Sequence, residues 1–94
     1  MSKERDFAEK FKELRETAGF QDPADLARHV ARLGYRKPSY FDIRRYERGD
    51  TQPHIGPFAA LVDALGLSQR EAMMLIRAAE PEKAPWRKPR PSKE

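Results

Sequence analysis

The chain has 94 residues, enough for one small domain with a single core and too few for a catalytic domain beside a sensory one. It has no cysteine, which excludes disulfide bonds and thiolate metal sites. No apolar run approaches the roughly 20 residues of a membrane span, and the start, MSKERDF, lacks a signal-peptide core, so we expect a cytoplasmic protein with no membrane contact.

The net charge of +4 is concentrated in two places. Residues 36–48 have five basic and two acidic side chains, and so do residues 81–94, whereas residues 1–35 balance seven against seven. Concentrated positive charge is typical of phosphate binding, although a solvated charged face explains it equally well from charge alone.

Two amphipathic helices are predicted in the first third of the chain. The first should end before Gly19, a residue that readily adopts the left-handed conformation at a helix end. The second should begin with Asp22 as N-cap and Pro23 in the first turn, and should end at Gly34. The predicted inward positions are Phe7, Phe11, Leu14 and Ala18 in the first helix, and Leu26, Ala27, Val30 and Leu33 in the second.

A third, shorter helix is predicted from about Tyr40 to Arg48. Ser39, with Asp42 three residues later, resembles a capping box, and Gly49 should close the helix. With Ile43 at the centre of the buried face and a turn of about 100° per residue, one side of this helix faces inward and the other faces solvent. The predicted inward residues are Ser39, Tyr46 and Glu47; the outward residues are Phe41, Arg45 and Arg48, flanked by Tyr40, Asp42 and Arg44.

Two further helices complete the predicted domain after a polar turn at residues 50–54. The fourth has the apolar stripe Ile55, Phe58, Leu61, Val62 and Leu65 and ends at Gly66. The fifth begins with a Ser68 to Glu71 capping box, directs Ala72, Leu75, Ile76 and Ala79 inward, and should end near Glu80. Since no strand candidate is found, we expect a compact all-α domain of five helices at residues 1–80.

The segment at residues 81–94 has a different composition. It contains four prolines, five basic residues and one large apolar side chain, Trp86, so it cannot build a core. We expect a disordered or extended basic tail that offers DNA or another polyanion only charge, with Trp86 exposed.

The outward side of the third helix has the side chains that DNA recognition uses. An arginine fork matches guanine O6 and N7 or a phosphate, and an apolar or aromatic group can contact a thymine methyl. An outward Phe41 next to Arg45 is hard to explain by packing, although Tyr40 and Phe41 could instead fold onto the core or onto Tyr35. This helix therefore fits the DNA major groove.

The order of these signals resembles the phage-repressor (Cro-like, xenobiotic-response-element) helix-turn-helix family. The resemblance depends on "FKELRETAGF" and "DLA" in the first two helices, "SYFDIRRYERGDTQP" through the third and "IGPFAALVDALGLS" in the fourth, and it covers about residues 7–79. Each piece is short, but their joint occurrence in this order is specific. Two features depart from the family. About six extra residues lie between Leu26 and Glu47, and we expect them to lengthen helix two and to replace the tight turn. Asp22-Pro23 lies where family members often have an amide that bonds phosphate.

The resemblance implies a transcriptional regulator, expected to be a repressor associated with the nucleoid, that binds double-stranded DNA as a homodimer on half-sites about 34–36 Å apart. It also implies an ion pair between Arg15 and Glu47, for which the alternative is two unrelated surface charges. The positions that match base or phosphate contacts in the family are Ser39, Tyr40, Phe41, Asp42, Arg44, Arg45, Arg48, Thr51, Gln52 and His54.

The sequence also bears on two other classes of function, an enzyme and a protein-binding module. An enzyme is not expected, because the two histidines, His29 and His54, lie far apart in the sequence and there is no Gly-rich phosphate loop; no metal or cofactor is expected either. A protein-binding adaptor or antitoxin-like module on the same fold is the main alternative, with a partner bound through helix five or the tail. Its basis is the run Met73, Met74, Leu75 and Ile76, which exceeds one buried stripe and which we assign to dimerisation, unless the methionines only fill gaps in the core.

Overall fold

The structure is a computed structural model that describes residues 3–79. In this range it has five α-helices and no strand: α1 (Lys3–Thr17), α2 (Pro23–Arg32), α3 (Tyr40–Arg48), α4 (Ile55–Leu65) and α5 (Gln69–Ala78). The predicted all-α fold with five helices is confirmed. The expectations for the tail at residues 81–94, Trp86 included, lie outside the described residues.

Three helices, α2, α3 and α5, begin where their capping residues predict. The Asp22 carboxylate accepts a hydrogen bond from the Ala24 N–H at the start of α2. Both capping boxes are formed: in α3 between Ser39 and Asp42, and in α5 between Ser68 and Glu71. Each box satisfies two backbone N–H groups that a helix start leaves without a partner, which fixes the first turn locally.

Gly49 ends α3 in the left-handed conformation, with φ at 81°. Its N–H binds back to the Tyr46 carbonyl at 3.2 Å, and the next residue, Asp50, binds the Arg45 carbonyl at 3.0 Å. A side chain at Gly49 would strain this backbone. The chain therefore turns away immediately after Arg48, which leaves that residue on the last exposed turn of α3.

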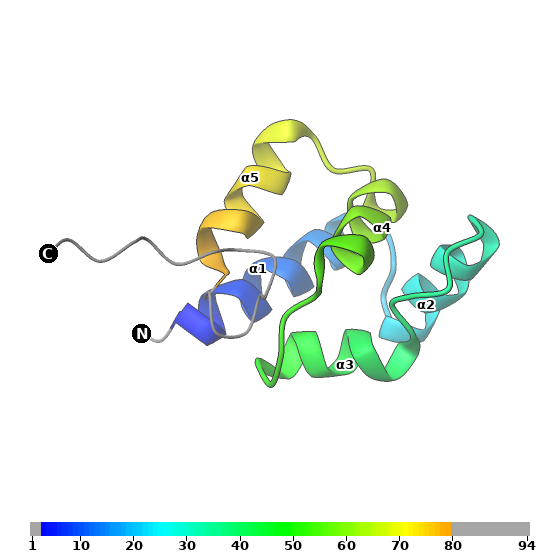
Figure 1. Cartoon of the computed structure of the whole chain (residues 1–94), viewed down its shortest axis with the longest axis horizontal. Helices are drawn as coiled ribbons and strands as arrows, with labels where there is room; N and C mark the ends of the chain where they lie inside the picture. Colours follow the sequence, from blue (N-terminus) through cyan, green and yellow to red (C-terminus); the bar gives the residue numbers. More distant parts are fainter. Residues whose placement is uncertain (1–2, 80–94) are drawn as a thin grey trace, which may run out of the picture.

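The core lies around α1, which packs against α3 and α5, while α2 packs against α3 and α4 (Figure 1). Aromatic rings from α1 make its centre: Phe7 stacks on Phe11 at a centroid distance of 6.3 Å, and Phe11 meets Tyr46 of α3 edge to face at 6.1 Å. The larger buried apolar side chains are Phe7, Phe11, Leu14, Leu26, Val30, Ile43, Tyr46, Phe58, Leu61, Leu65 and Leu75. No helix within residues 3–79 has both the length and the apolar character to cross a membrane.

Four predicted inward residues are exposed, and all four lie at helix ends. Ser39 is the N-cap of α3. Ala18 follows the last residue of α1 and is exposed. Leu33 is the C-cap of α2 and is 43% exposed, and Ile55, the first residue of α4, is 59% exposed. A periodic pattern assigns a face to every position, but the terminal turn extends past the neighbouring helix that would cover it.

The extra residues between α2 and α3 form the connection at 33–39. The expectation that they lengthen α2 is therefore wrong for residues 33–39, because α2 ends at Arg32. The connection is tied to the body of the molecule by Tyr35, whose hydroxyl donates to the Asp63 carboxylate of α4 at 2.6 Å. That hydrogen bond raises the pKa of Tyr35 above its ordinary value.

Candidate nucleic-acid interface

α3 presents the face that the sequence predicts. Ile43 and Tyr46 are buried, with exposed fractions of 0% and 5%, whereas Phe41 is 72% exposed. The side chains of Arg45 and Arg48 are 53% and 57% exposed. Within residues 3–79, no other helix covers Phe41 or Arg45, so both side chains are exposed on the outer side of α3.

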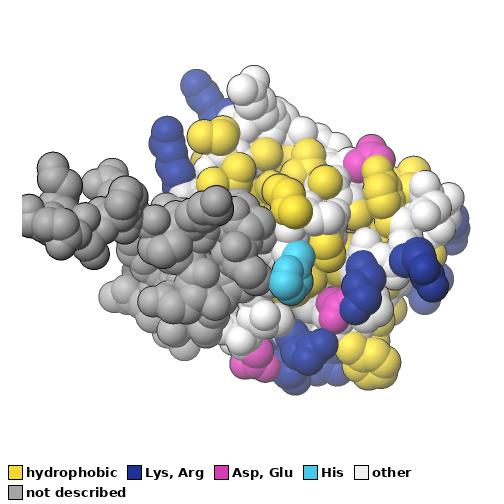
Figure 2. Space-filling model, in the orientation of Figure 1, with side chains coloured by type: hydrophobic (Ala, Val, Ile, Leu, Met, Phe, Trp, Pro, Cys, Tyr) yellow, Lys and Arg dark blue, Asp and Glu magenta, His cyan; other side chains and the backbone are white. Residues whose placement is uncertain are grey.

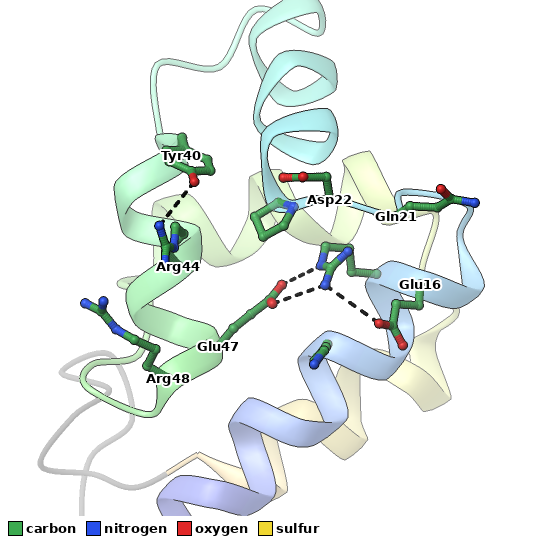
Figure 3. Close-up of a pocket in the computed structure, with 10 residues that line it drawn as sticks. Glu16, Gln21, Asp22, Tyr40, Arg44, Glu47 and Arg48 are labelled. Atoms are coloured by element: carbon green, nitrogen blue, oxygen red, sulfur yellow. Dashed lines mark hydrogen bonds and ion pairs between the residues drawn. The ribbon is translucent and has the colours of Figure 1, made fainter.

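Glu47 points inward from α3 and pairs with Arg15 of α1 (Figure 3). The Arg15 Nε donates to Glu47 Oε2 at 2.5 Å, and Nη2 donates to Oε1 at 3.2 Å. A third bond, also 2.5 Å long, runs from Arg15 Nη1 to the Phe20 carbonyl. Since the two side chains are 3% and 11% exposed, this is a buried bidentate pair, and the predicted contact between Arg15 and Glu47 is confirmed.

Asp42 is placed differently from the expectation that it contacts bases or the nearest phosphates. Its Oδ2 accepts from the Ser39 N–H at 3.0 Å, and its Oδ1 accepts from Arg45 Nη2 at 3.1 Å. The Lys37 Nζ lies 3.6 Å from the same carboxylate, whose side chain is only 13% exposed. Burial raises the pKa of Asp42, but the hydrogen bonds from Ser39 and Arg45 outweigh it, so that the pKa is lowered. Asp42 is therefore a helix cap and an ion-pair partner, largely withdrawn from the outer surface.

With both carboxylates of α3 turned inward or paired, the outer surface of the helix is cationic and aromatic. Phe41, Arg44, Arg45 and Arg48 line one shallow depression, which we call the α3 outer face. Figure 2 shows Lys and Arg side chains along the lower edge of the molecule, where α3 lies, with apolar side chains on the face turned to the viewer. This arrangement matches the phosphates and base edges of a duplex.

Three neighbouring contacts restrain side chains of the α3 outer face. The Tyr40 and Phe41 rings meet edge to face at 5.4 Å. Arg44 donates to the Tyr40 hydroxyl at 3.3 Å, and its guanidinium lies 5.7 Å from the centre of that ring. Arg48 pairs with Asp50 at 3.1 Å, an exposed contact of the kind that is worth about 0–1 kcal/mol and that a phosphate can replace.

The three residues after α3 that are expected to contact phosphate differ in their exposure. His54 is exposed and Thr51 is half-buried, whereas Gln52 is only 2% exposed. The expectation that the Gln52 side chain contacts phosphate is therefore not met, because its amide lies in the interior. Ser39 is exposed, but its hydroxyl accepts the Asp42 N–H at 3.3 Å as the helix cap.

Sequence reasoning missed two lysines beside α3. Lys12 of α1 lines the cleft between α1, the start of α2 and α3. Arg44 and Arg48 line the same cleft from α3 (Figure 3). Lys37 lies over Asp42, next to Arg45. Lys12 precedes Arg15 by one helical turn, so once Arg15 is assigned to Glu47 of α3, helical spacing alone places Lys12 close to the same helix.

α5 divides the predicted dimerisation residues between core and surface. Leu75 is 1% exposed and Ile76 is half-buried against the core. The predicted role in dimerisation is wrong for Leu75, because its side chain packs in the interior. Met73 and Met74, in contrast, are 42% and 38% exposed and line a surface hollow with Gln69, Arg70 and Arg77.

Comparisons of the chain with protein-family models, with curated proteins and with solved structures found no match.

Proposed function

We propose that the protein is a sequence-specific DNA-binding regulator of transcription that inserts α3 into the major groove. The observation that carries this proposal is the α3 outer face, where an exposed aromatic side chain and three arginines lie together on one short helix. Neither folding nor core packing needs Phe41 to be 72% exposed. A duplex offers both an apolar partner, the thymine methyl, and acceptors for arginine.

The charges that remain on the surface of α3 also support this function. In α3, Glu47 neutralises Arg15 in the interior, and Asp42 holds Arg45 and the helix start. Both acids of the helix are therefore kept away from an incoming phosphate backbone. Arg44 and Arg48, with Lys12 beside them, are assigned to phosphates, and Phe41 and Arg45 to base edges.

The test is the binding of the full chain to duplexes selected from a random pool, measured at several salt concentrations. We expect affinity to fall steeply with salt, by about 0.9 logarithmic units per tenfold increase in salt for each phosphate contacted. Arg45→Ala should cost about 1–3 kcal/mol and relax the preference at one base pair, whereas Arg48→Ala should weaken all sequences equally. Absence of any selected sequence would refute the proposal.

A protein-binding adaptor is the second candidate, and the exposed Met73 and Met74 support it. The same two side chains support a symmetric dimer, which would present two copies of α3 to half-sites about one helical turn of DNA apart. Salt-insensitive association with another protein, and none with DNA, would favour the adaptor. Two-fold symmetry in the selected DNA sequences would favour the dimeric regulator.

A further inference from the structure

Asp42 and Arg45 form a pair within the proposed recognition helix that has a use beyond capping. They are three residues apart, and Asp42 Oδ1 lies 3.1 Å from Arg45 Nη2. The other carboxylate oxygen, Oδ2, accepts the Ser39 N–H at 3.0 Å, which fixes the orientation of the carboxylate itself. The carboxylate is thus anchored to the backbone at one oxygen and holds an arginine with the other.

We propose that Asp42 is a positioning residue that holds the Arg45 guanidinium in place for a guanine in the DNA major groove. The inference is based on the proposed function and names the base that this part of α3 selects. Asp42 itself does not touch DNA in this arrangement, since its side chain is 13% exposed and both of its oxygens have partners.

The physical gain is pre-organisation. A free arginine side chain on a helix surface samples many rotamers, and their loss on binding costs about 0.5–1.5 kcal/mol. Because Asp42 already restrains Arg45, the side chain loses this rotamer freedom when the protein folds and not when it binds DNA. A guanidinium has five N–H donors, and the contact with Asp42 engages one, so two donors can still meet guanine O6 and N7.

The same carboxylate also works against the wrong base. Arg45 paired with Asp42 is less free to swing toward the N7 of an adenine or toward a neighbouring phosphate. Lys37, 3.6 Å from the carboxylate, keeps the surroundings of Asp42 positive and offsets its repulsion of phosphates. Selectivity for guanine thus depends on Asp42, while the total affinity depends on the arginines.

The test compares Asp42→Asn with wild type on the selected duplex and on duplexes changed at the base pair that Arg45→Ala relaxes. Asparagine keeps an oxygen for the Ser39 N–H but loses the charge that holds Arg45. We expect discrimination at that base pair to fall about threefold to tenfold, as the ratio of specific to altered-site affinity. In the Arg45→Ala background the same change should have no further effect.

Glu71→Gln provides a matched control, because Glu71 occupies the same position in the capping box of α5, where it accepts the Ser68 N–H at 2.9 Å. The Glu71→Gln substitution neutralises a capping carboxylate and leaves α3 unchanged, so the base preference should not change. A measurement that needs no DNA is the NMR order parameter of the Arg45 Nε–H bond. It should decrease in Asp42→Asn, because the side chain is then less restrained.

The outcomes separate the two proposals. Unchanged discrimination in Asp42→Asn, with a wild type that selects DNA, overturns the positioning role and leaves the proposed function standing. Failure of the wild type to select any duplex overturns both. If Asp42→Asn reduced base discrimination equally with Arg45 present and with Arg45→Ala, Asp42 would act only through helix stability. That result would also overturn the proposal.

Discussion

Removal of the Glu47 carboxylate should destabilise the fold before it changes DNA specificity. In Glu47→Ala, the Arg15 guanidinium remains 3% exposed and loses both carboxylate bonds, at 2.5 and 3.2 Å. Breaking one side of a buried ion pair costs about 3–5 kcal/mol, because the remaining charge is left buried without compensation. Arg15 keeps its bond to the Phe20 carbonyl, so we expect a value near the lower end, about 3 kcal/mol.

For a domain of this size, a loss of about 3 kcal/mol corresponds to a fall in melting temperature of about 12–24 °C. The assay is thermal and urea unfolding followed by circular dichroism, together with base preference measured well below the transition. Base preference should be retained, because Phe41 and Arg45 lie on the opposite side of α3 from Glu47.

Glu16→Ala is the matched control. Glu16 also lies near Arg15, at 3.9 Å from Nη2, but its side chain is 55% exposed, so we expect a change within about 0.5 kcal/mol. Replacement of the whole pair, as Arg15→Met with Glu47→Leu, should recover most of the stability, since it leaves no buried charge. A melting temperature for Glu47→Ala within about 3 °C of wild type would refute the reasoning.

Three other outcomes are expected. Met73→Glu with Met74→Glu should dissociate a dimer while the protomer stays folded; sedimentation that shows a wild-type monomer at micromolar concentration, with and without DNA, would count against it. The stability difference between wild type and Asp42→Asn should be present at neutral pH and should shrink as pH falls below about 4. The folded pKa of Asp42 is lowered, so the unfolded chain binds more protons than the folded chain in that range. Urea unfolding at pH 7 and pH 3 measures this difference. Arg44→Ala with Arg48→Ala should reduce the salt slope of DNA binding by up to about 1.8, the value for two phosphates, and an unchanged slope would remove both from the phosphate contacts.

The parts of the fold that sequence predicts well are those fixed by short-range chemistry. α3 begins after Ser39 and ends at Gly49 as its capping box and left-handed glycine indicate. Its faces follow from one choice, Ile43 inward, because helical geometry then places every other residue on the helix. The inward direction of Glu47 follows in the same way.

The placement of Gln52 depends on neighbours that are distant in sequence. Gln52 is polar and sits in a turn, so no local signal predicts an amide that is 2% exposed. In the apolar run of α5, helical spacing already directs Leu75 and Ile76 inward, and both pack on the core where α5 meets α1, so assigning the whole run to dimerisation extended it past the exposed Met73 and Met74. The case of Asp42 is similar, because the predicted capping box already implied that its carboxylate was engaged.

The orientation of α3 is set by α1 more directly than by the connection at residues 33–39. Two contacts from one helix fix its inner side: Phe11 against Tyr46 at 6.1 Å, and Arg15 with Glu47 at 2.5 Å. They lie one turn apart on α1, so together they restrain both the position and the rotation of α3 about its axis. A longer connection between α2 and α3 can therefore be accommodated at little cost in loop entropy without turning Phe41 and Arg45 away from solvent. The buried pair of Arg15 and Glu47 therefore predicts which side of α3 faces solvent better than the length of the turn does.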